Sequence, residues 1–221
     1  MCGIVGVFNL NKKIISKKTL LSMASKISHR GPDGEGYFVK DNIGLAHKRL
    51  AILDVTKKGA QPMNSKSNRW TIIFNGCIYN FPELKLELES KGYKFSSKSD
   101  TEVICEGLDE YGISFFERLN GMFAIAIWDN NKNQLILARD RIGQKPLFYY
   151  HYEEGIIFSS ELNSLLNNRI IPRDIDKEAI SEYLLYDTFV QPNTPIKNVK
   201  KLEAGHAIII DRKNNKLKKW K

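Results

Sequence analysis

The sequence predicts an α+β fold, because strands and helices occur in blocks rather than in strict alternation. Two pairs of strand-like segments are joined by turns of only three or four residues, Met122–Asp129 to Gln134–Arg139 and Leu147–Tyr152 to Ile156–Ser159. Strands joined by such short turns must be antiparallel. The block order and the antiparallel pairing both favour α+β over a doubly wound parallel sheet.

Eight segments in all show the short apolar or alternating pattern of β-strands. In chain order they are Ile4–Phe8, Ile43–Ala46, Thr71–Phe74, Met122–Asp129, Gln134–Arg139, Leu147–Tyr152, Ile156–Ser159 and Ala207–Asp211. Met122–Trp128 is apolar at every position, which is typical of a central strand covered on both faces. Asn75–Gly76 and Asn120–Gly121 have the composition of turns.

Helical signals occur at four places along the chain. The predicted helices cover Leu20–Ile27, Pro82–Lys91 between Asn80 and Gly92, Ser99–Tyr111, and Asp176–Tyr186. Ser99 and Glu102 form an S-x-x-E capping box at the start of the third helix. The stretch Pro172–Pro195 differs in composition, and we interpret it as an arm over the core rather than a domain.

The composition is that of an ordinary globular protein. Of 221 residues, 42% are apolar and 27% are charged. The longest apolar run is far too short to cross a bilayer, so no membrane association is expected. Cys2–Phe8 lacks the preceding basic residues of a signal peptide. With only three cysteines, at least one cannot pair, and we expect reduced thiols in a cytoplasmic protein.

The formal charge of +9 raises the question of nucleic-acid binding. Lysine is spread along the whole chain, and no aromatic residues interleave with basic ones as in an RNA-binding surface. We therefore interpret the charge as a solvated lysine-rich surface and expect no nucleic-acid partner. The chain has no CxxC pair, and its four histidines are scattered, so no metal site is expected.

Cys2 is the first residue whose side chain could act as a nucleophile. Methionine aminopeptidases generally remove Met1 when the second side chain is small, which would give Cys2 a free α-amine beside its thiol. An α-amine has a pKa of about 7.7–8.0, so part of it is an unprotonated base at neutral pH. Such an amine can activate a nucleophile. Taken alone, the pattern favours a buried cysteine that starts an apolar strand.

Eight motifs that follow one another along the chain favour the interpretation of Cys2 as a nucleophile instead. They are Met1–Phe8, His29–Gly34, Ala46–Asp54, Gly59–Met63, Asn75–Asn80, Ser99–Glu102, Leu119–Ala124 and Arg139–Leu147. In this order they closely resemble the glutaminase domain of glutamine-dependent asparagine synthetases. The resemblance runs from residue 1 to about Asp211, and the ordered set is highly specific although each motif alone is weak.

The resemblance implies a class II glutamine amidotransferase domain over residues 1–211. It also implies the four-layer αββα sandwich of N-terminal-nucleophile hydrolases, with two antiparallel sheets. Residues 212–221 would begin a linker to an ATP-dependent synthetase domain that is absent from the chain, because no Ser-Gly-Gly-x-Asp-Ser phosphate loop is present. We expect an excised domain rather than a stand-alone glutaminase. ATP and magnesium are expected only in that absent domain, and no cofactor is expected here.

The same resemblance assigns roles to residues of the matching motifs. Cys2 would be the nucleophile and its own amine the base. The side-chain amide of Asn75 and the backbone N–H of Gly76 would form the oxyanion hole. Arg49 would hold the α-carboxylate of glutamine and Asp100 its α-ammonium. The backbone near Leu50 and Ile52 would line the same pocket.

These roles suit the chemistry of the residues. An arginine fork matches a carboxylate bidentately, although Arg49 at a strand end would otherwise be a surface residue. Gly76 has no side chain, so a substrate can approach its N–H closely. Asp100 follows the capping Ser99, where a carboxylate also stabilises the helix dipole. Asp100 can therefore serve the helix and the substrate together.

Position 77 departs from the family, which usually has glutamate where this chain has Cys77. The family glutamate helps to bind the substrate α-ammonium. The loss of one hydrogen bond to a charged group costs roughly 1.5–3 kcal/mol, or about 10- to 150-fold in affinity. We therefore expect weak glutamine use, tightened by Cys77→Glu. A disulfide between Cys77 and Cys2 is a further possibility.

Three functions follow from these observations. The first is an amidotransferase domain that releases ammonia for an ATP-activated carboxylate, either aspartate, the family default, or a sugar acid. The second is a non-catalytic module whose pocket has decayed, and the third is a hydrolase for a different amide. The expected partners are L-glutamine and the synthetase domain of the same protein, and a homodimer is left open. Arg30–Asp33 is interpreted as a rigid turn and Arg139–Asp140 as a strand-end ion pair.

Overall fold

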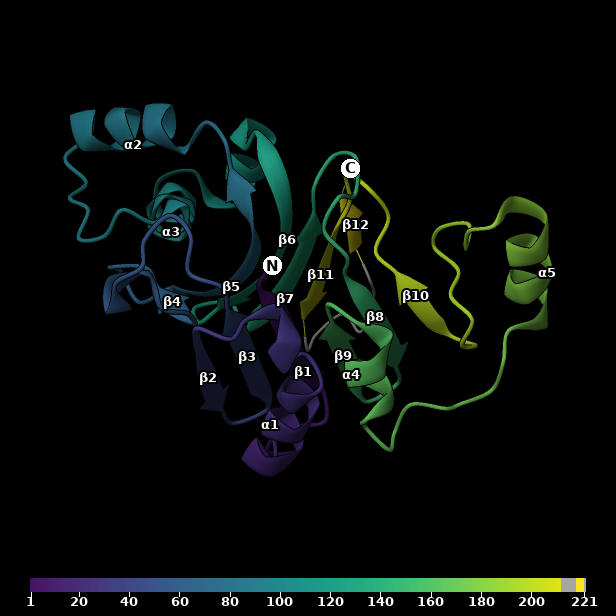
Figure 1. Cartoon of the computed structure of the whole chain (residues 1–221). Coiled ribbons are helices and arrows are strands. Elements are labelled where there is room, and N and C mark those ends of the chain that lie inside the picture. The colour runs from purple at the N-terminus through teal and green to yellow at the C-terminus, as the bar shows by residue number, and fades with distance from the viewer. Residues whose placement is uncertain (212–217, 221) are drawn as a thin grey trace.

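The computed structural model describes residues 1–211 and 218–220. Within these residues, two six-stranded sheets stack face to face (Figure 1). The first sheet has the spatial order β10 (Val199–Lys201), β8 (Phe148–Tyr152), β9 (Gly155–Ser159), β1 (Gly3–Asn9), β3 (Ile43–Arg49), β2 (Gly34–Lys40). The second has the order β12 (Lys218–Trp220), β11 (Ala207–Asp211), β7 (Gln134–Arg139), β6 (Gly121–Asp129), β5 (Trp70–Ile78), β4 (Met63–Asn64). All neighbouring strands are antiparallel.

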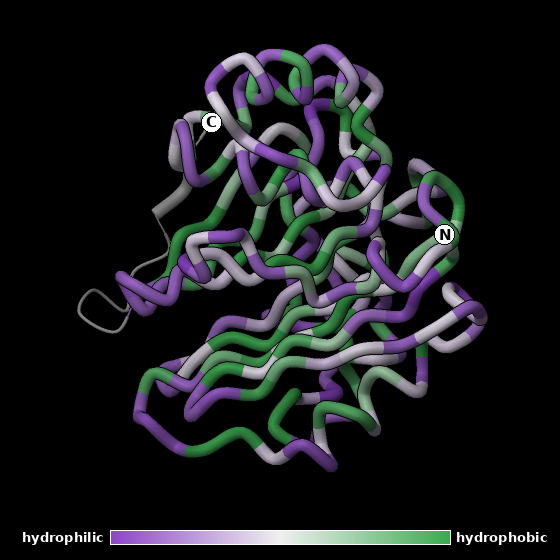
Figure 2. Tube along the Cα trace, turned by 90° about the vertical axis from the view of Figure 1, so that its left-hand side faces the viewer, coloured by the Kyte–Doolittle hydropathy of each residue, from purple (hydrophilic) through white to green (hydrophobic). Residues whose placement is uncertain are grey.

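The centre of the protein lies between the two sheets. Apolar side chains from both inner faces interdigitate there, with Phe8 and Leu45 from the first sheet against Ile73 and Trp128 from the second. The rings of Phe8 and Trp128 meet edge to face at 5.1 Å between centroids. In Figure 2 the hydrophobic stretches of the strands run through this middle layer. Two facing sheets bury their apolar faces in this way without help from a third element.

Helices cover the outer face of each sheet. The helices α1 (Lys17–Ser25) and α4 (Leu162–Leu166) pack on the first sheet, and α2 (Phe81–Ser90) and α3 (Asp100–Tyr111) pack on the second. Short 3-10 helices occupy Ser28–Arg30 (η1), Lys57–Gly59 (η2) and Gly112–Arg118 (η3). The predicted α+β fold and the four-layer αββα sandwich are thereby confirmed.

The start of α3 differs in one detail from the predicted capping box. Ser99 does cap the helix, because its hydroxyl accepts the N–H of Thr101 at 3.1 Å. Glu102, however, does not reach back to Ser99. Its carboxylate accepts the N–H groups and hydroxyls of Ser96 and Ser97 and so orders the preceding loop. Glu102 therefore fixes the approach to α3 rather than closing the box.

The predicted turn at Asn75–Gly76 is wrong. Both residues continue strand β5, paired with Ala124 and Phe123 of β6. Pairing along the full length of β6 overrides the local turn preference of the Asn-Gly dipeptide. A side chain at Gly76 would meet the carbonyl oxygen of Met122 at 2.2 Å, so glycine permits this close strand contact.

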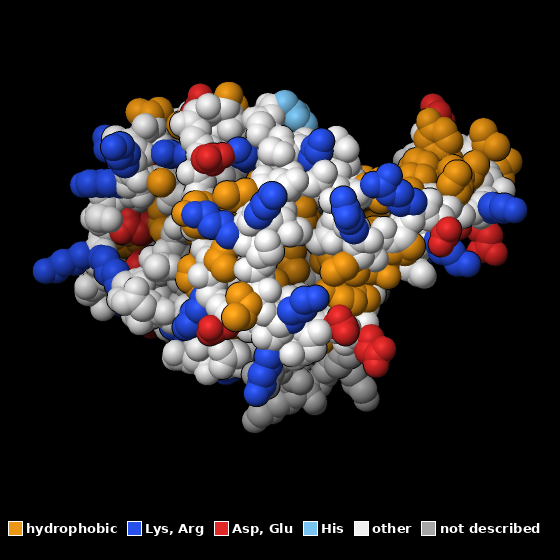
Figure 3. Space-filling view, turned by 90° about the horizontal axis from the view of Figure 1, so that it is seen from below, with side chains coloured by type: hydrophobic (Ala, Val, Ile, Leu, Met, Phe, Trp, Pro, Cys, Tyr) orange, Lys and Arg blue, Asp and Glu red, His pale blue; other side chains and the backbone are white. Residues whose placement is uncertain are grey.

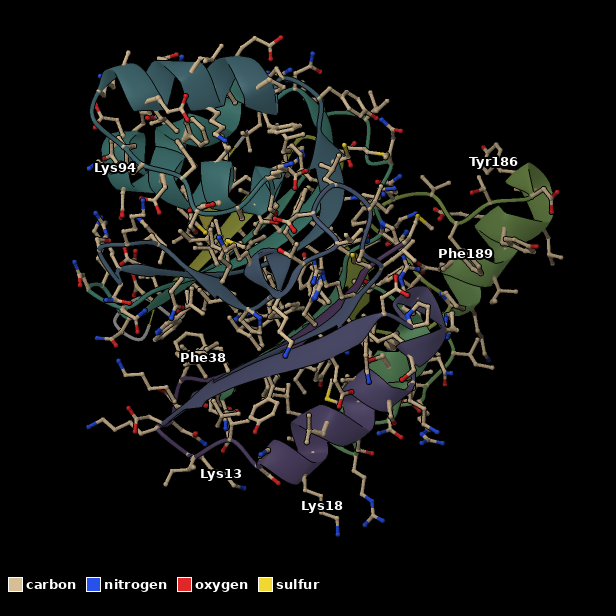
Figure 4. The ribbon with its side chains drawn as sticks, turned by 60° about the vertical axis from the view of Figure 1, so that its left-hand side comes forward. Lys13, Lys18, Phe38, Lys94, Tyr186 and Phe189 are labelled. Atoms are coloured by element: carbon tan, nitrogen blue, oxygen red, sulfur yellow. The ribbon has the colours of Figure 1, made fainter. Side chains whose placement is uncertain are left out.

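Helix α5 (Lys177–Tyr186) stands apart from the sandwich at the end of a loop (Figure 1). Only Ala179 of this helix is buried, whereas Leu184 and Leu185 are 79% and 78% exposed. Figure 3 shows apolar side chains gathered on this projecting arm. Figure 4 places Tyr186 and Phe189 on it, away from the sheets.

Four strands have no counterpart among the predicted segments, namely β2, β4, β10 and β12. Of the segment predicted to begin a linker, residues 212–217 and 221 lie outside the described residues, and Lys218–Trp220 pair with β11. A search of the described residues finds no helix with both the length and the apolar character needed to cross a membrane.

Candidate active site

One cavity of about 150 Å³ brings together residues from the start of β1, the end of β3, strand β5 and the start of α3. Its lining contains every residue predicted for the site, which are Cys2, Arg49, Leu50, Ile52, Asn75, Gly76, Cys77 and Asp100. These residues are spread over almost a hundred positions of the chain. The fold therefore places them around a single space.

Cys2 is held at the mouth of this cavity by its backbone. The Arg30 guanidinium donates through Nε to the Cys2 carbonyl at 2.9 Å and through Nη1 to Glu161 at 2.9 Å. The Cys2 thiol is half-buried against the backbone of Leu50, with Sγ 3.4 Å from the Leu50 nitrogen and 3.6 Å from its carbonyl oxygen. Backbone and side chain of Cys2 are thus both fixed.

Burial raises the pKa of the Cys2 thiol, and the N–H of Leu50 and the nearby chain amine oppose that rise only in part. A thiol with a raised pKa is uncharged at neutral pH, and the thiolate is the reactive form. The thiol at this position therefore needs a base close by before it can act as a nucleophile.

Asn75 supplies an unusual donor to the cavity. The residue is 1% exposed, and its Nδ2 is a buried nitrogen with no hydrogen-bond partner in the described part of the chain. A buried donor without a partner costs roughly 1–3 kcal/mol, so such groups in native proteins call for a functional explanation. The Asn75 side chain thus has a donor available for a ligand oxygen in the cavity.

The backbone of β5 places a second donor beside it. Phe74 donates its N–H to the Gln61 side chain at 2.6 Å, and Ile78 donates its N–H to Asp100 at 3.0 Å. Both N–H groups therefore point away from β6, and β4 pairs only with Thr71 and Ile72. Because N–H directions alternate along a strand, the Gly76 N–H lies between them on the same uncovered edge.

Arg49 lies at the end of β3, with its guanidinium toward the loop that follows. Its Nη1 donates to the carbonyl of Thr56 at 2.8 Å and its Nη2 to the carbonyl of Asp54. Asp54 is anchored in turn by Thr56 and by the N–H of Lys98, and these hydrogen bonds lower its pKa to about 2. The loop thus holds Arg49 against the cavity through its backbone carbonyls.

Asp100 is the first residue of α3 and is only 5% exposed. Burial raises the pKa of its carboxyl to about 6, against the lowering effect of the N–H groups of Ile78 and Thr101. A carboxylate in such a setting gains from a cationic partner, because the partner offsets the cost of burying the charge. Asp100 is therefore suited to receive an ammonium group.

Lys145 and Met1 also line the cavity, and sequence reasoning did not assign either to the site. Lys145 is 7% exposed, and its ammonium donates to the Met1 sulfur at 3.3 Å. The only signal in the sequence was membership of the Arg139–Leu147 motif. Nothing in the spacing of that motif shows that its lysine lines the cavity.

Two further predicted motifs have structural roles around this cavity. In Arg30–Asp33, a side chain at Gly31 would meet the Lys48 backbone at 2.3 Å, and Asp33 accepts the N–H of Ala51 at 2.9 Å. The predicted ion pair between Arg139 and Asp140 is wrong. Asp140 accepts the N–H groups of Phe123, Gln144 and Lys145, whereas Arg139 donates to the carbonyls of Lys145, Gly143 and Leu202.

A wider and more open cavity of about 880 Å³ lies beside α3, and it contains none of the predicted site residues. Charged side chains of both signs line it, including Lys66, Arg69, Asp109 and Glu110. Within the described residues, no group of three or more acidic, histidine or cysteine side chains is arranged to hold a metal ion.

Comparison with known proteins identifies the domain family of the chain. The glutamine amidotransferase domain model matches residues 1–221. Asparagine synthetase [glutamine-hydrolyzing] 1 of Bacillus subtilis is 41% identical over 95% of this chain and 33% of its own length. Asparagine synthetase B of Escherichia coli is 38% identical over 75% of this chain and 30% of its own length. The chain thus spans about a third of the length of these relatives.

Solved structures agree on the fold. The glutamine phosphoribosylpyrophosphate amidotransferase of B. subtilis superposes with a TM-score of 0.71 at 20% identity, covering 99% of this chain and 49% of that one. The allosteric regulatory enzyme of purine biosynthesis superposes with a TM-score of 0.72 at 19% identity, over 99% of this chain and 48% of that one. The matched domain model shows that the chain belongs to the glutamine amidotransferase domain family, and within that family it is similar to part of the glutamine-hydrolysing asparagine synthetases.

Proposed function

We propose that the chain, once Met1 has been removed, hydrolyses the side-chain amide of L-glutamine to glutamate and ammonia. The observation that carries this proposal is the buried Asn75 nitrogen, which has no partner among the described residues. It lies beside the Gly76 N–H on the uncovered edge of β5, in the cavity that is also lined by Cys2. Two donors next to a nucleophile form the arrangement that stabilises the oxyanion of acyl transfer.

The chemistry begins at Cys2. Its own α-amine takes the proton of the thiol, and the sulfur attacks the carbon of the glutamine amide. The carbonyl oxygen becomes an oxyanion that Asn75 Nδ2 and the Gly76 N–H stabilise. The protonated amine then gives its proton to the leaving nitrogen, so ammonia departs and a thioester remains. Attack by water on the thioester releases glutamate and restores the thiol.

The charged ends of the cavity select the amino acid. Arg49, whose guanidinium donates to two backbone carbonyls in the described part of the chain, binds the α-carboxylate through its planar fork. Asp100 receives the α-ammonium, which favours the ionised form of a carboxyl whose pKa is about 6. The backbone of Leu50 and Ile52 closes one wall of the cavity.

The fate of the ammonia belongs to a larger protein. The relatives that match this chain are about three times as long, and their names describe glutamine-hydrolysing asparagine synthetases. We extend the proposal accordingly: a synthetase domain with ATP and magnesium passes the ammonia to an activated carboxylate, aspartate by analogy, in the cytoplasm. Ammonia transfer to a sugar acid is the alternative acceptor chemistry. No cofactor takes part in the hydrolytic half, and a dimer of the whole protein is compatible with it.

A glutaminase assay tests the proposal. Protein whose loss of Met1 has been verified by mass spectrometry is expected to release glutamate and ammonia from L-glutamine in equal amounts. A preparation that retains Met1 has no amine on Cys2 and serves as the matched control, expected to be inactive. Absence of glutamate from the Met1-free protein at every glutamine concentration would overturn the proposal and favour a non-catalytic module.

The pH dependence of kcat/KM for glutamine is expected to show an inflection caused by protonation of Asp100. Below about pH 6 the carboxyl is protonated and loses its attraction for the α-ammonium. Since kcat/KM reports the ionisable groups of the free enzyme, protonation of Asp100 should add a further fall of about tenfold per pH unit below that value. A second inflection near pH 8 belongs to the amine of Cys2.

The variant Asp100→Asn separates these two groups. It is expected to lower kcat/KM at pH 8 by about 10- to 150-fold, the contribution of one hydrogen bond to a charged group. The acidic inflection should disappear, while the inflection near pH 8 stays. Persistence of the acidic inflection in Asp100→Asn would assign it to another residue.

A further inference from the structure

Lys145 presents a buried positive charge to the proposed glutamine site. Its backbone is fixed on both sides, with its N–H donated to Asp140 at 3.0 Å and its carbonyl accepting from Arg139 at 2.7 Å. The side chain is 7% exposed and lines the cavity. Among residues 1–211, no carboxylate pairs with this ammonium, whose contact is the uncharged sulfur of Met1.

Removal of Met1 deprives Lys145 of that contact. The same cleavage that frees the α-amine of Cys2 therefore removes the contact that this ammonium makes within residues 1–211. A buried cation without a counter-charge is costly, and a ligand that brings negative charge is favoured by the same amount. Lys145 thus gives the cavity wall a positive charge, and removal of Met1 opens that charge to a ligand.

Cys77 lies close to this charge and does not neutralise it. Its side chain projects from the same face of β5 as that of Asn75, two residues away. Burial and the Asp100 carboxylate raise the pKa of the Cys77 thiol, against the opposing effect of Lys145. The thiol is therefore uncharged, and both Lys145 and Asp100 are near enough to act on it. An α-ammonium that approaches Asp100 consequently meets a like charge in the same part of the cavity.

The structure assigns to Lys145 and Cys77 a role in specificity that deepens the proposed function and rests on it. We propose that this pair shifts the preference of the site toward amides that carry a carboxylate but no α-ammonium. The simplest such amide is glutaramate, which is glutamine with hydrogen in place of its amino group. Arg49 still binds the carboxylate and Cys2 still faces the amide, so the hydrolytic steps are unchanged.

Kinetics with the two amides test this inference on the Met1-free protein. The unmodified protein is expected to prefer glutamine over glutaramate by about tenfold or less in kcat/KM. Lys145→Met removes the charge and keeps an unbranched side chain, and it should increase the preference for glutamine by about 10- to 150-fold. Cys77→Glu should do the same, because its carboxylate pairs with Lys145 and attracts the α-ammonium. Lys94→Met, an exposed lysine outside the cavity, is the matched control and should change nothing.

Binding provides a readout that does not depend on turnover. In Met1-free Cys2→Ala protein, calorimetry is expected to give similar affinities for the two amides, and Lys145→Met should separate them. A preference for glutamine above about a thousandfold that Lys145→Met leaves unchanged would overturn the inference while the proposed function stands. Failure to hydrolyse either amide would instead contradict the proposed function, and the binding data would still decide the role of Lys145.

Discussion

Cys2→Ala is expected to abolish the release of ammonia from glutamine, a loss on the order of 10⁶-fold in kcat by comparison with removal of other enzymic nucleophiles. Alanine is as small as cysteine, so Met1 is still removed and the α-amine is still present. Arg30 still holds the carbonyl of residue 2, because that contact is to the backbone. The variant therefore removes the sulfur and leaves the cavity in place.

Two measurements make this loss specific. Calorimetry should show that Cys2→Ala protein still binds glutamine, since Arg49 and Asp100 are untouched. Cys105→Ala is the matched control, because Cys105 lies on the buried side of α3 in the core and outside the cavity. It should keep its activity. If Cys2→Ala kept more than about 1% of the activity, another residue would have to be the nucleophile.

The fold was predictable because its signals are local. The limits of β7 and β11 agree to the residue with the predicted segments, and both hairpins form where short turns follow alternating apolar runs. The edge strand β2 was missed because Gly34 and Gly36 and the charged Glu35 weaken its strand signal. Strand β10, with three residues, is too short to show a period.

The gathering of the named residues around one cavity was predictable from the order of their motifs and not from local spacing. Cys2, Arg49 and Asp100 come from three separate elements, and only the stacking of the two sheets and α3 brings them to one cavity. Lys145 shows the limit of that approach. The direction of the Lys145 side chain depends on a loop that folds around the Asp140 carboxylate. This carboxylate accepts the N–H groups of Phe123, Gln144 and Lys145. No pattern in the sequence encodes that direction.

Asn75→Ala is expected to lower kcat by about 10²- to 10³-fold, the cost of losing one oxyanion-hole donor. The KM for glutamine should change little, because the carboxylate and the ammonium are bound by Arg49 and Asp100. The oxyanion forms only on the way to the thioester, so the missing donor raises the barrier without weakening the initial complex. Progress curves over a range of glutamine concentrations separate the two constants.

Stability and a matched asparagine distinguish this role from a structural one. Because Asn75 Nδ2 makes no hydrogen bond in the free protein, its removal relieves a buried unpaired donor worth roughly 1–3 kcal/mol and offsets the lost packing. The free energy of unfolding in urea should therefore stay about the same. Asn80→Ala is the matched control, since the Asn80 side chain forms hydrogen bonds with the backbone of Arg118 and Asn120 and does not line the cavity. It should cost stability and leave kcat unchanged, the opposite pattern to Asn75→Ala. If Asn75→Ala instead unfolds the protein and keeps kcat in the remaining folded fraction, Asn75 supports β5 and is not part of the oxyanion hole.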